Sequence, residues 1–229
     1  MRMERMKTFS FEQRMVHHLI LKSPFINDLG LFHGKMGIAL FFFEYGRSTG
    51  CDVYTDIAEE LLDDIWALID AELSISFESG LSGIGWGIEY LLQNRFISGD
   101  GNEVCEEMDR IIMQTDLCRL DDQRLDTGLE GLFYYVSARM QGAASQKNPL
   151  PFDRRYREDL HLVNSFFDMD DLDAFYNRYP VSVFPFLSSA LLTEETYVSA
   201  SLGLKDGLAG FLLNSKYKDY ETFVYNERS

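Results

Sequence analysis

The stretch Gly30–Leu40, GLFHGKMGIAL, carries three glycines within eight residues and leads into the apolar run FFFEYG. Glycine in a helix interior costs about 1 kcal/mol relative to alanine, so glycines beside such a segment need a specific reason. Similar text returns as GLSGIGWGIEYLL from Gly80, GLEGLFYYV from Gly128 and GLKDGLAGFLL from Gly203. This self-similarity indicates an internal repeat, and the repeat unit predicts the fold.

Each repeat unit follows the same plan. About 50 residues separate the first three units, and the fourth follows after about 75 residues, which leaves room for further helix. A glycine-bearing turn leads into an apolar helix, and a polar loop then leads into a helix with a single apolar face. In the first unit residues 38–43 are apolar on all sides, which is typical of a buried helix. Thr55 is placed to cap the amphipathic helix that follows.

The later units are predicted from the same periodicity. The second unit has an apolar helix over residues 84–92 and an amphipathic one around residues 104–112. Pro149 and Pro151 interrupt the chain after the third apolar helix. Residues 153–167 read as an amphipathic helix, and residues 166–180 as an acidic, aromatic helix that ends at Pro180. Residues 181–193 are apolar and ambiguous.

Alternating buried and amphipathic helices are what two concentric rings of helices require, because the inner helix is covered on all sides. The sequence therefore predicts an all-α fold of stacked helical hairpins that curve into a ring or arc. No low-complexity linker divides the chain, so we expect a single domain over residues 1–229. The glycines would stand where inner helices converge, because a residue without Cβ permits close backbone approach.

The composition narrows the function. Hydrophobic residues make up 46% and charged residues 25% of the chain, an ordinary globular balance, and the net charge is −16. This charge argues against nucleic acid as a ligand and allows a cationic peptide, although solubility is the plainer reason for it. No apolar run approaches the ~20 residues that cross a membrane, and the charged N-terminal sequence is no secretory signal. The three cysteines suggest no disulfide framework, so we expect a cytoplasmic protein.

Glycine turns that open apolar helices at about 50-residue spacing resemble the lanthionine synthetase C-like (LanC-like) family. GLSGIGWGIEYLL and GLKDGLAGFLL carry the resemblance most closely, and it extends over most of the chain as repeats. The resemblance implies an α/α toroid of seven hairpins, with the active site where the turns before the inner helices meet. Four clear repeats are present here, so the predicted toroid is incomplete.

The resemblance also implies a catalytic zinc ion. In the family, two cysteines and a histidine hold zinc, which activates a peptide cysteine for addition to a dehydrated serine or threonine. The only His-Gly pair here, at His33, follows Phe32 where the family has a cysteine. The position of the family's catalytic aspartate holds Ser76, and that of its turn histidine holds Asp206.

The cysteines also depart from the family's pattern. They lie away from the predicted entries to the inner helices, at Cys51, Cys105 and Cys118. We therefore expect no zinc cofactor and no zinc-dependent cyclisation, which would make the chain a pseudoenzyme.

A few polar residues at the turns are weak catalytic candidates. His33 is the first, although histidines in such turns commonly cap a helix or bond a carbonyl group. Carboxylates also gather at the turns: Asp28, Glu78, Asp126, Glu130 and Asp206. Two opposed carboxylates are able to hydrolyse a glycosidic bond, but a helix N-terminus favours their ionised form and opposes a general-acid role. His33, Glu130 and Asp206 are kept as candidates, and no catalytic residue is assigned.

The leading prediction is a peptide-binding or accessory protein in peptide modification, with a peptide or a peptide-modifying enzyme as its partner. The alternatives are a divergent lanthionine cyclase-type enzyme and an α/α-toroid carbohydrate hydrolase. Aromatic residues on the inner helices would line the open side of an incomplete ring: Phe41, Phe42, Phe43, Trp86, Tyr90, Phe133, Tyr134 and Tyr135. Such an exposed surface would serve as a peptide groove or as the seam of a homodimer.

Overall fold

The computed structural model describes residues 9–69, 72–182, 184, 187 and 192–215. Within these ranges the regular structure is helical, and the only strand-like pairing described is a single bridge between Ser201 and Gly207. The all-α prediction is confirmed.

Four inner helices begin at glycine turns in the described part of the chain. They are α2 (Lys35–Thr49), α4 (Leu81–Gln93), α7 (Leu129–Gln146) and a helix over residues 208–215. In α2 every residue from Lys35 to Phe43 is buried, and α4 is buried from Leu81 to Leu92. This all-round burial is what their apolar sequences predict.

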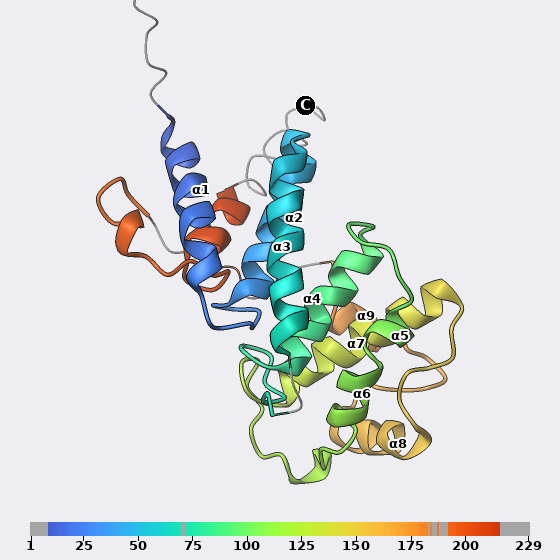
Figure 1. The fold of residues 1–229 in the computed structure, drawn as a ribbon. Coiled ribbons are helices and arrows are strands. Elements are labelled where there is room, and N and C mark those ends of the chain that lie inside the picture. The colour runs from blue at the N-terminus through green and yellow to red at the C-terminus, as the bar shows by residue number, and fades with distance from the viewer. Residues whose placement is uncertain (1–8, 70–71, 183, 185–186, 188–191, 216–229) are drawn as a thin grey trace, which may run out of the picture.

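The other helices are only partly buried and precede or connect the inner ones along the chain. They are α1 (Phe11–Lys22), α3 (Asp52–Leu68), α5 (Gly101–Val104), α6 (Glu106–Ile112), α8 (Arg154–Val163) and α9 (Asp173–Arg178). Short 3-10 turns add η1 (Ser23–Phe25), η2 (Leu117–Arg119) and η3 (Tyr197–Ser199). Figure 1 shows α1 beside the C-terminal residues 192–215, with α7, α8 and α9 toward the other end of the arc. One hydrophobic core joins residues from Met15 to Leu213.

The four inner helices share one backbone register. In each, the N–H of the first helical residue donates to the carbonyl oxygen seven residues earlier, at Lys35–Asp28 (2.9 Å), Leu81–Ser74 (2.8 Å), Leu129–Asp122 (2.9 Å) and Leu208–Ser201 (2.8 Å). The equivalent glycines are thus Gly34, Gly80, Gly128 and Gly207. The sequence-based matching of Gly30 and Gly203 to Gly80 is wrong by four residues, although the repeats themselves are real.

A second set of glycines shows why glycine is needed within the first turn of these apolar helices. They lie three residues further into each helix, at Gly37, Gly83, Gly131 and Gly210, and a Cβ there would lie 1.7–2.2 Å from a backbone carbonyl oxygen six residues earlier. Real Cβ atoms do not approach a carbonyl oxygen that closely. The turn folds back onto the first turn of its own helix, and only glycine leaves the space.

Several predicted boundaries are wrong for local reasons. Thr55 lies inside α3, because left-handed Gly50 ends α2 and the next helix starts at once at Asp52. The predicted helix over residues 104–112 is interrupted at Cys105, which separates α5 from α6.

The later helices are shorter than predicted. The helix over residues 153–167 ends at Val163, because Asn164 adopts an extended conformation. The helix predicted over residues 166–180 is reduced to α9, which ends two residues before Pro180. Residues 181–193 lie partly outside the described residues. No helix in the described ranges has the length and apolar character needed to span a bilayer.

Candidate functional site

The turns that precede the inner helices meet at one end of the arc. We call residues 28–34, 74–80, 122–128 and 201–207 the turn cluster. Backbone hydrogen bonds join neighbouring turns, from Lys205 N to Phe32 O (3.0 Å), from Phe32 N to Glu78 O (2.9 Å) and from Glu78 N to Asp126 O (2.9 Å). The fourth turn therefore adjoins the first, and the spatial order is fourth, first, second, third. This is the end at which the family resemblance places an active site.

His33 lies in the turn cluster beside Glu78. Its Nε2 is 3.4 Å from Oε1 of Glu78, and about a third of each side chain is exposed, 37% and 32%. Each comes from a different turn, and the backbone bond between Phe32 and Glu78 sets their spacing. A carboxylate beside one ring nitrogen orients an imidazole and leaves the other nitrogen for a ligand. The sequence placed Glu78 among the turn carboxylates but did not pair it with His33.

The third turn supplies a more extensive polar group. Arg124 donates to Asp122, with 2.9 Å between Nη2 and Oδ2, and Thr127 donates to the same carboxylate at 2.6 Å. These bonds, first those from Arg124, hold the pKa of Asp122 well below its usual range. Asp126 lies 3.8 Å from the Arg124 guanidinium. The group is thus a charged surface that is largely satisfied from within its own turn.

Glu130 and Asp206, the other two candidates, occupy different surroundings. Glu130 lies in the first turn of α7, and its Oε1 is 3.5 Å from Nη2 of Arg178 on α9. Asp206 precedes the N-cap glycine of the fourth repeat, the position that His33 holds in the first, and its φ is +54°. Because the fourth turn contacts the first, Asp206 and His33 belong to adjacent turns. The described ion pairs of His33 include Glu78 but neither of these two carboxylates.

The cysteines do not lie where the family's zinc site would need them. Cys51 occupies the N-cap position of α3 at the far end of α2, which is about 22 Å long at 1.5 Å per residue. Cys105 is buried between α5 and α6, and Cys118 is exposed in η2. Among the residues that the structure describes, no group of three His, Cys, Asp or Glu side chains is arranged to hold a metal ion. These donors do not fit a zinc ion held by two thiolates and an imidazole.

A buried ion network lies outside the turn cluster. Arg139 of α7 is fully buried and contacts Glu89 of α4 (2.5 Å) and Asp109 of α6 (2.7 Å). The Tyr135 hydroxyl also donates to Asp109, at 2.6 Å. Burial raises the pKa of Glu89 and of Asp109, and the attraction of Arg139 opposes this rise. A signal for the network was present in the sequence, since lone charges inside apolar helices must find partners. Its role is to join inner and outer helices.

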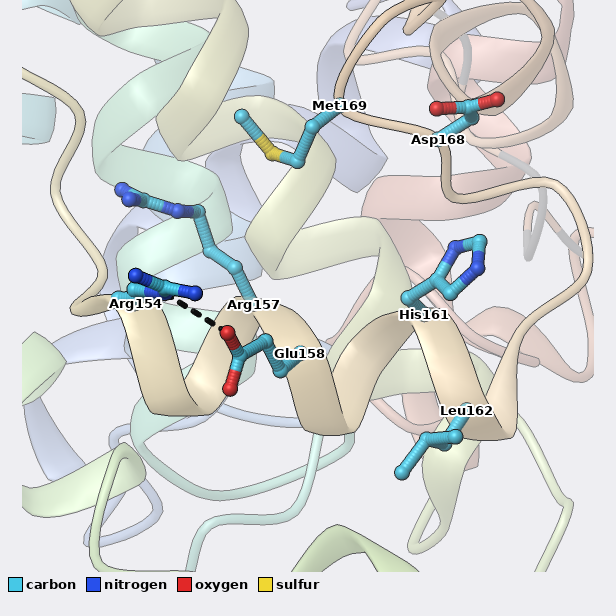
Figure 2. Close-up of a pocket in the computed structure, with 7 residues that line it drawn as sticks. All are labelled: Arg154, Arg157, Glu158, His161, Leu162, Asp168 and Met169. Carbon is cyan, nitrogen blue, oxygen red and sulfur yellow. Dashed lines mark hydrogen bonds and ion pairs between the residues drawn. The ribbon is translucent and has the colours of Figure 1, made fainter.

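A cleft on α8 also lies away from these candidate residues. Figure 2 shows it on α8, with Met169 and Asp168 on the segment that follows; its volume is about 630 Å³. Arg154 is paired with Glu158 on the same helix (2.8 Å), and Arg157 donates to the Phe152 carbonyl. His161 donates from Nδ1 to the Phe167 carbonyl oxygen, at 2.8 Å. With cations and carboxylates balanced and already engaged, the cleft indicates no particular ligand.

Fold and turn cluster together define an α/α-toroid protein, built from inner and outer helices whose turns converge at one end. The chain belongs to the LanC-like family: a family model described as "Lanthionine synthetase C-like protein" matches residues 26–147, more than half of its length. The match begins before the first turn and includes α2 to α7. No curated protein and no solved structure matches the chain. The four inner helices described compare with the seven hairpins that the resemblance implies.

Proposed function

We propose that this LanC-like protein binds a peptide, or a peptide-modifying enzyme, at the turn cluster, and that it has no zinc-dependent cyclase activity. One observation carries the proposal. The turns that would frame the family's active site are joined backbone to backbone, yet the donors among them do not suit the family's zinc ion.

The charge of the turn cluster supports a cationic peptide as the ligand. Its carboxylates, Asp28, Glu78, Asp122, Asp126 and Asp206, outnumber its cations Arg124 and Lys205. Opposite charge raises the association rate of a ligand and favours it over competitors, an effect that salt weakens. Glu78 is the carboxylate of choice for a test, because it is part exposed and its described ion pair is with His33.

Selection from a random dodecapeptide library on the immobilised full chain tests the binding proposal. We expect the selected peptides to be rich in Lys and Arg and to bind Glu78→Ala at least about tenfold more weakly, which is about 1.4 kcal/mol. The matched control is Glu158→Ala, which removes an exposed carboxylate on α8 and should leave affinity unchanged. Equal affinity for all three proteins, measured by calorimetry, would show that the turn cluster is not the binding surface.

Metal analysis of protein purified without chelator tests the second half of the proposal. One zinc ion per chain, lost when the cysteines are replaced by serine, would contradict it.

Proton-transfer catalysis is a second candidate function, and the contact between His33 and Glu78 is the observation that favours it. A carboxylate-oriented imidazole is a common general base. Turnover of a selected peptide that is abolished in His33→Ala while the peptide still binds would favour this enzyme. Hydrolysis of a carbohydrate through Glu130 or Asp206 stays a prediction, for which alanine substitution at these positions is the test.

A further inference from the structure

The aromatic residues of the inner helices are buried, contrary to the expectation that they would line an open side. Each is at most 8% exposed: Phe41, Phe42, Phe43, Trp86, Tyr90, Phe133, Tyr134 and Tyr135. Tyr179 and Phe184 are among the residues that pack against them. These eight residues therefore form no open groove, and a further binding site has to come from another surface.

A cleft lies between the end of α6 and the first turns of α8, and it shares no lining residue with the cleft in Figure 2. Its volume is about 310 Å³, within the range of sites for small ligands. Figure 1 shows α6 and α8 near each other. We call this the α6–α8 cleft, and its lining residues are Met113, Gln114, Thr115, Asp116, Asp153, Arg155, Tyr156 and Asp159.

Three carboxylates and one cation line the α6–α8 cleft. Asp116 pairs with Arg119, with 3.1 Å between Oδ2 and Nε, and Asp153 is occupied as the N-cap of α8. Among the contacts of the described residues there is no ion pair of Asp159 or of Arg155, although the two are one helical turn apart. Asp159 is therefore the carboxylate that is available to a cation from outside.

Tyr156 adds a hydroxyl that has no hydrogen-bond partner among the described residues. Its side chain lines the cleft and is only 3% exposed, and the hydroxyl oxygen itself is buried. Burial, and after it the charges of Asp109 and Asp159, raises the pKa of Tyr156, so the hydroxyl stays neutral. A buried hydroxyl without a partner is costly and needs an explanation, which a bound ligand supplies.

These groups favour an organic cation over an anion or a metal ion. The surplus of carboxylates opposes an anion. In the described ranges no three His, Cys, Asp or Glu side chains are placed to hold a metal ion. A guanidinium group presents five N–H donors in one plane, pairs with a carboxylate through two of them and is weakly hydrated. Asp159 would accept such a pair of bonds, and the Tyr156 oxygen a further one.

We propose that the α6–α8 cleft binds a guanidinium group, with Asp159 as the counter-ion and the Tyr156 hydroxyl as a neutral acceptor. The inference does not depend on peptide binding at the turn cluster, because it rests on different residues. Arg155 lines the same cleft and repels a second cation, so its replacement strengthens binding.

Calorimetric titration of the full chain with N-acetyl-L-argininamide tests the site. We expect Asp159→Asn to weaken binding at least about tenfold and Tyr156→Phe at least about threefold, whereas Arg155→Gln should strengthen it. Glu158→Gln is the matched control: it removes the same charge from the neighbouring residue, which pairs with Arg154, and should leave the affinity unchanged.

Two further probes define the ligand. N-acetyl-L-citrullinamide has nearly the same shape without the charge and should not bind. Methylguanidinium chloride distinguishes the sources of the group: affinity equal to that of N-acetyl-L-argininamide assigns the cleft to a small free guanidine, and weaker binding assigns it to an arginine side chain. Equal affinity of wild type and Asp159→Asn for N-acetyl-L-argininamide, or no binding at millimolar probe, would overturn the proposal.

The hydroxyl of Tyr156 also allows a test that needs no ligand. Tyr156→Phe removes an oxygen that has no hydrogen bond to lose, so its melting temperature should equal or exceed that of the wild type. Tyr135→Phe is the matched control, because the Tyr135 hydroxyl donates to Asp109 at 2.6 Å and its removal should lower the melting temperature. An equal drop in both variants would show that the Tyr156 hydroxyl is satisfied within the fold, and the proposal would fail.

The α6–α8 cleft and the turn cluster can be tested apart. In a Glu78→Ala background, which removes a carboxylate of the turn cluster, Asp159→Asn should weaken binding of N-acetyl-L-argininamide by the same factor as in the wild type. Loss of this effect would mean that the probe binds at the turn cluster and would overturn the proposal. Failure of peptide selection on the turn cluster would leave the titration of the cleft unaffected.

Discussion

At the scale of single residues, the glycines decide how closely a turn approaches its own helix. Gly83 is the clearest example, because a Cβ there would lie 1.9 Å from the carbonyl oxygen of Phe77. Phe77 also donates its N–H to Asp126 in the next turn, at 3.0 Å, so its backbone is not free to move away. The small residue serves close packing rather than chemistry.

Replacing Gly83 by alanine should destabilise the fold. Overpacking of this kind costs about 1–3 kcal/mol, and we expect the upper part of that range because the clash is with backbone. The free energy of unfolding in urea, monitored by circular dichroism, measures the effect. Gly99→Ala is the matched control: its nearest neighbours would lie 3.6 Å away, so a change within about 0.5 kcal/mol is expected. Similar stability of the two variants would contradict the close-approach account.

The sequence predicted residue roles unevenly. The glycine turns, and the absence of cysteines from them, could be predicted because composition and spacing are properties of the sequence alone. The choice of Gly34 rather than Gly30 as the equivalent of Gly80 could not be predicted, because both glycines are followed by residues that fit the repeat. The contact between His33 and Glu78 was also not predictable, since it depends on how two turns 45 residues apart hydrogen bond to each other.

At the scale of helices, buried elements were predicted better than exposed ones. Helices α2, α4 and α7 have apolar sequences that leave one reading, whereas the ends of α3, α8 and α9 depend on caps and single backbone conformations. Asp153 shows such a cap: its carboxylate accepts from the N–H of Tyr156 at 2.7 Å and starts α8. Here the predicted start was correct, and only the end was wrong.

Replacing Asp153 by alanine should weaken α8. Loss of an N-cap costs typically about 1 kcal/mol, and the neighbouring Phe152 and Tyr156 are buried, so the loss should appear in global stability. Differential scanning calorimetry of wild type and variant measures it. Glu158→Ala, which removes only an exposed pair with Arg154, should change stability by less than about 0.5 kcal/mol. If both variants melt alike, the cap does not limit the stability of α8.

At the scale of the whole molecule, Arg139 connects the inner to the outer helices through two buried carboxylates. Burial is the first cause of the raised pKa of Glu89, and Arg139 and Gln93 oppose it. Between the ordinary value of 4.5 and this raised pKa, the folded protein therefore holds a proton at Glu89 that the unfolded chain has released. Its contribution to the free energy of unfolding then falls as pH rises through this window.

Glu89→Gln isolates this pH dependence, and Arg139 keeps Asp109 as its partner. Below the folded pKa the wild-type carboxyl is protonated and resembles the amide, so the two proteins should differ least there. As pH rises from 4 toward 8, urea unfolding should show the wild type losing stability relative to the variant. The opposite trend would mean that attraction to Arg139 outweighs burial and that the pKa of Glu89 is lowered.

The ring itself could be predicted from the sequence because alternating buried and amphipathic helices have few other solutions. What fills its inner side could not. Phe184 lies in the apolar stretch that was ambiguous by pattern, and its packing on Trp86 and Tyr90 is a contact between residues about 95 positions apart in the sequence. The buried position of the inner aromatic residues therefore followed from tertiary contacts alone.

One backbone hydrogen bond is shared by the starts of all four inner helices described, from the first helical residue to the carbonyl oxygen seven residues earlier. It uses only main-chain atoms, so the side chain of the residue just before each N-cap glycine takes no part in this bond. In this chain the four such places carry His33, Ser79, Thr127 and Asp206, which differ in charge, size and reactivity. Substitution at these four positions can therefore change the chemistry of the turn cluster while the backbone hydrogen bond that starts each inner helix is kept.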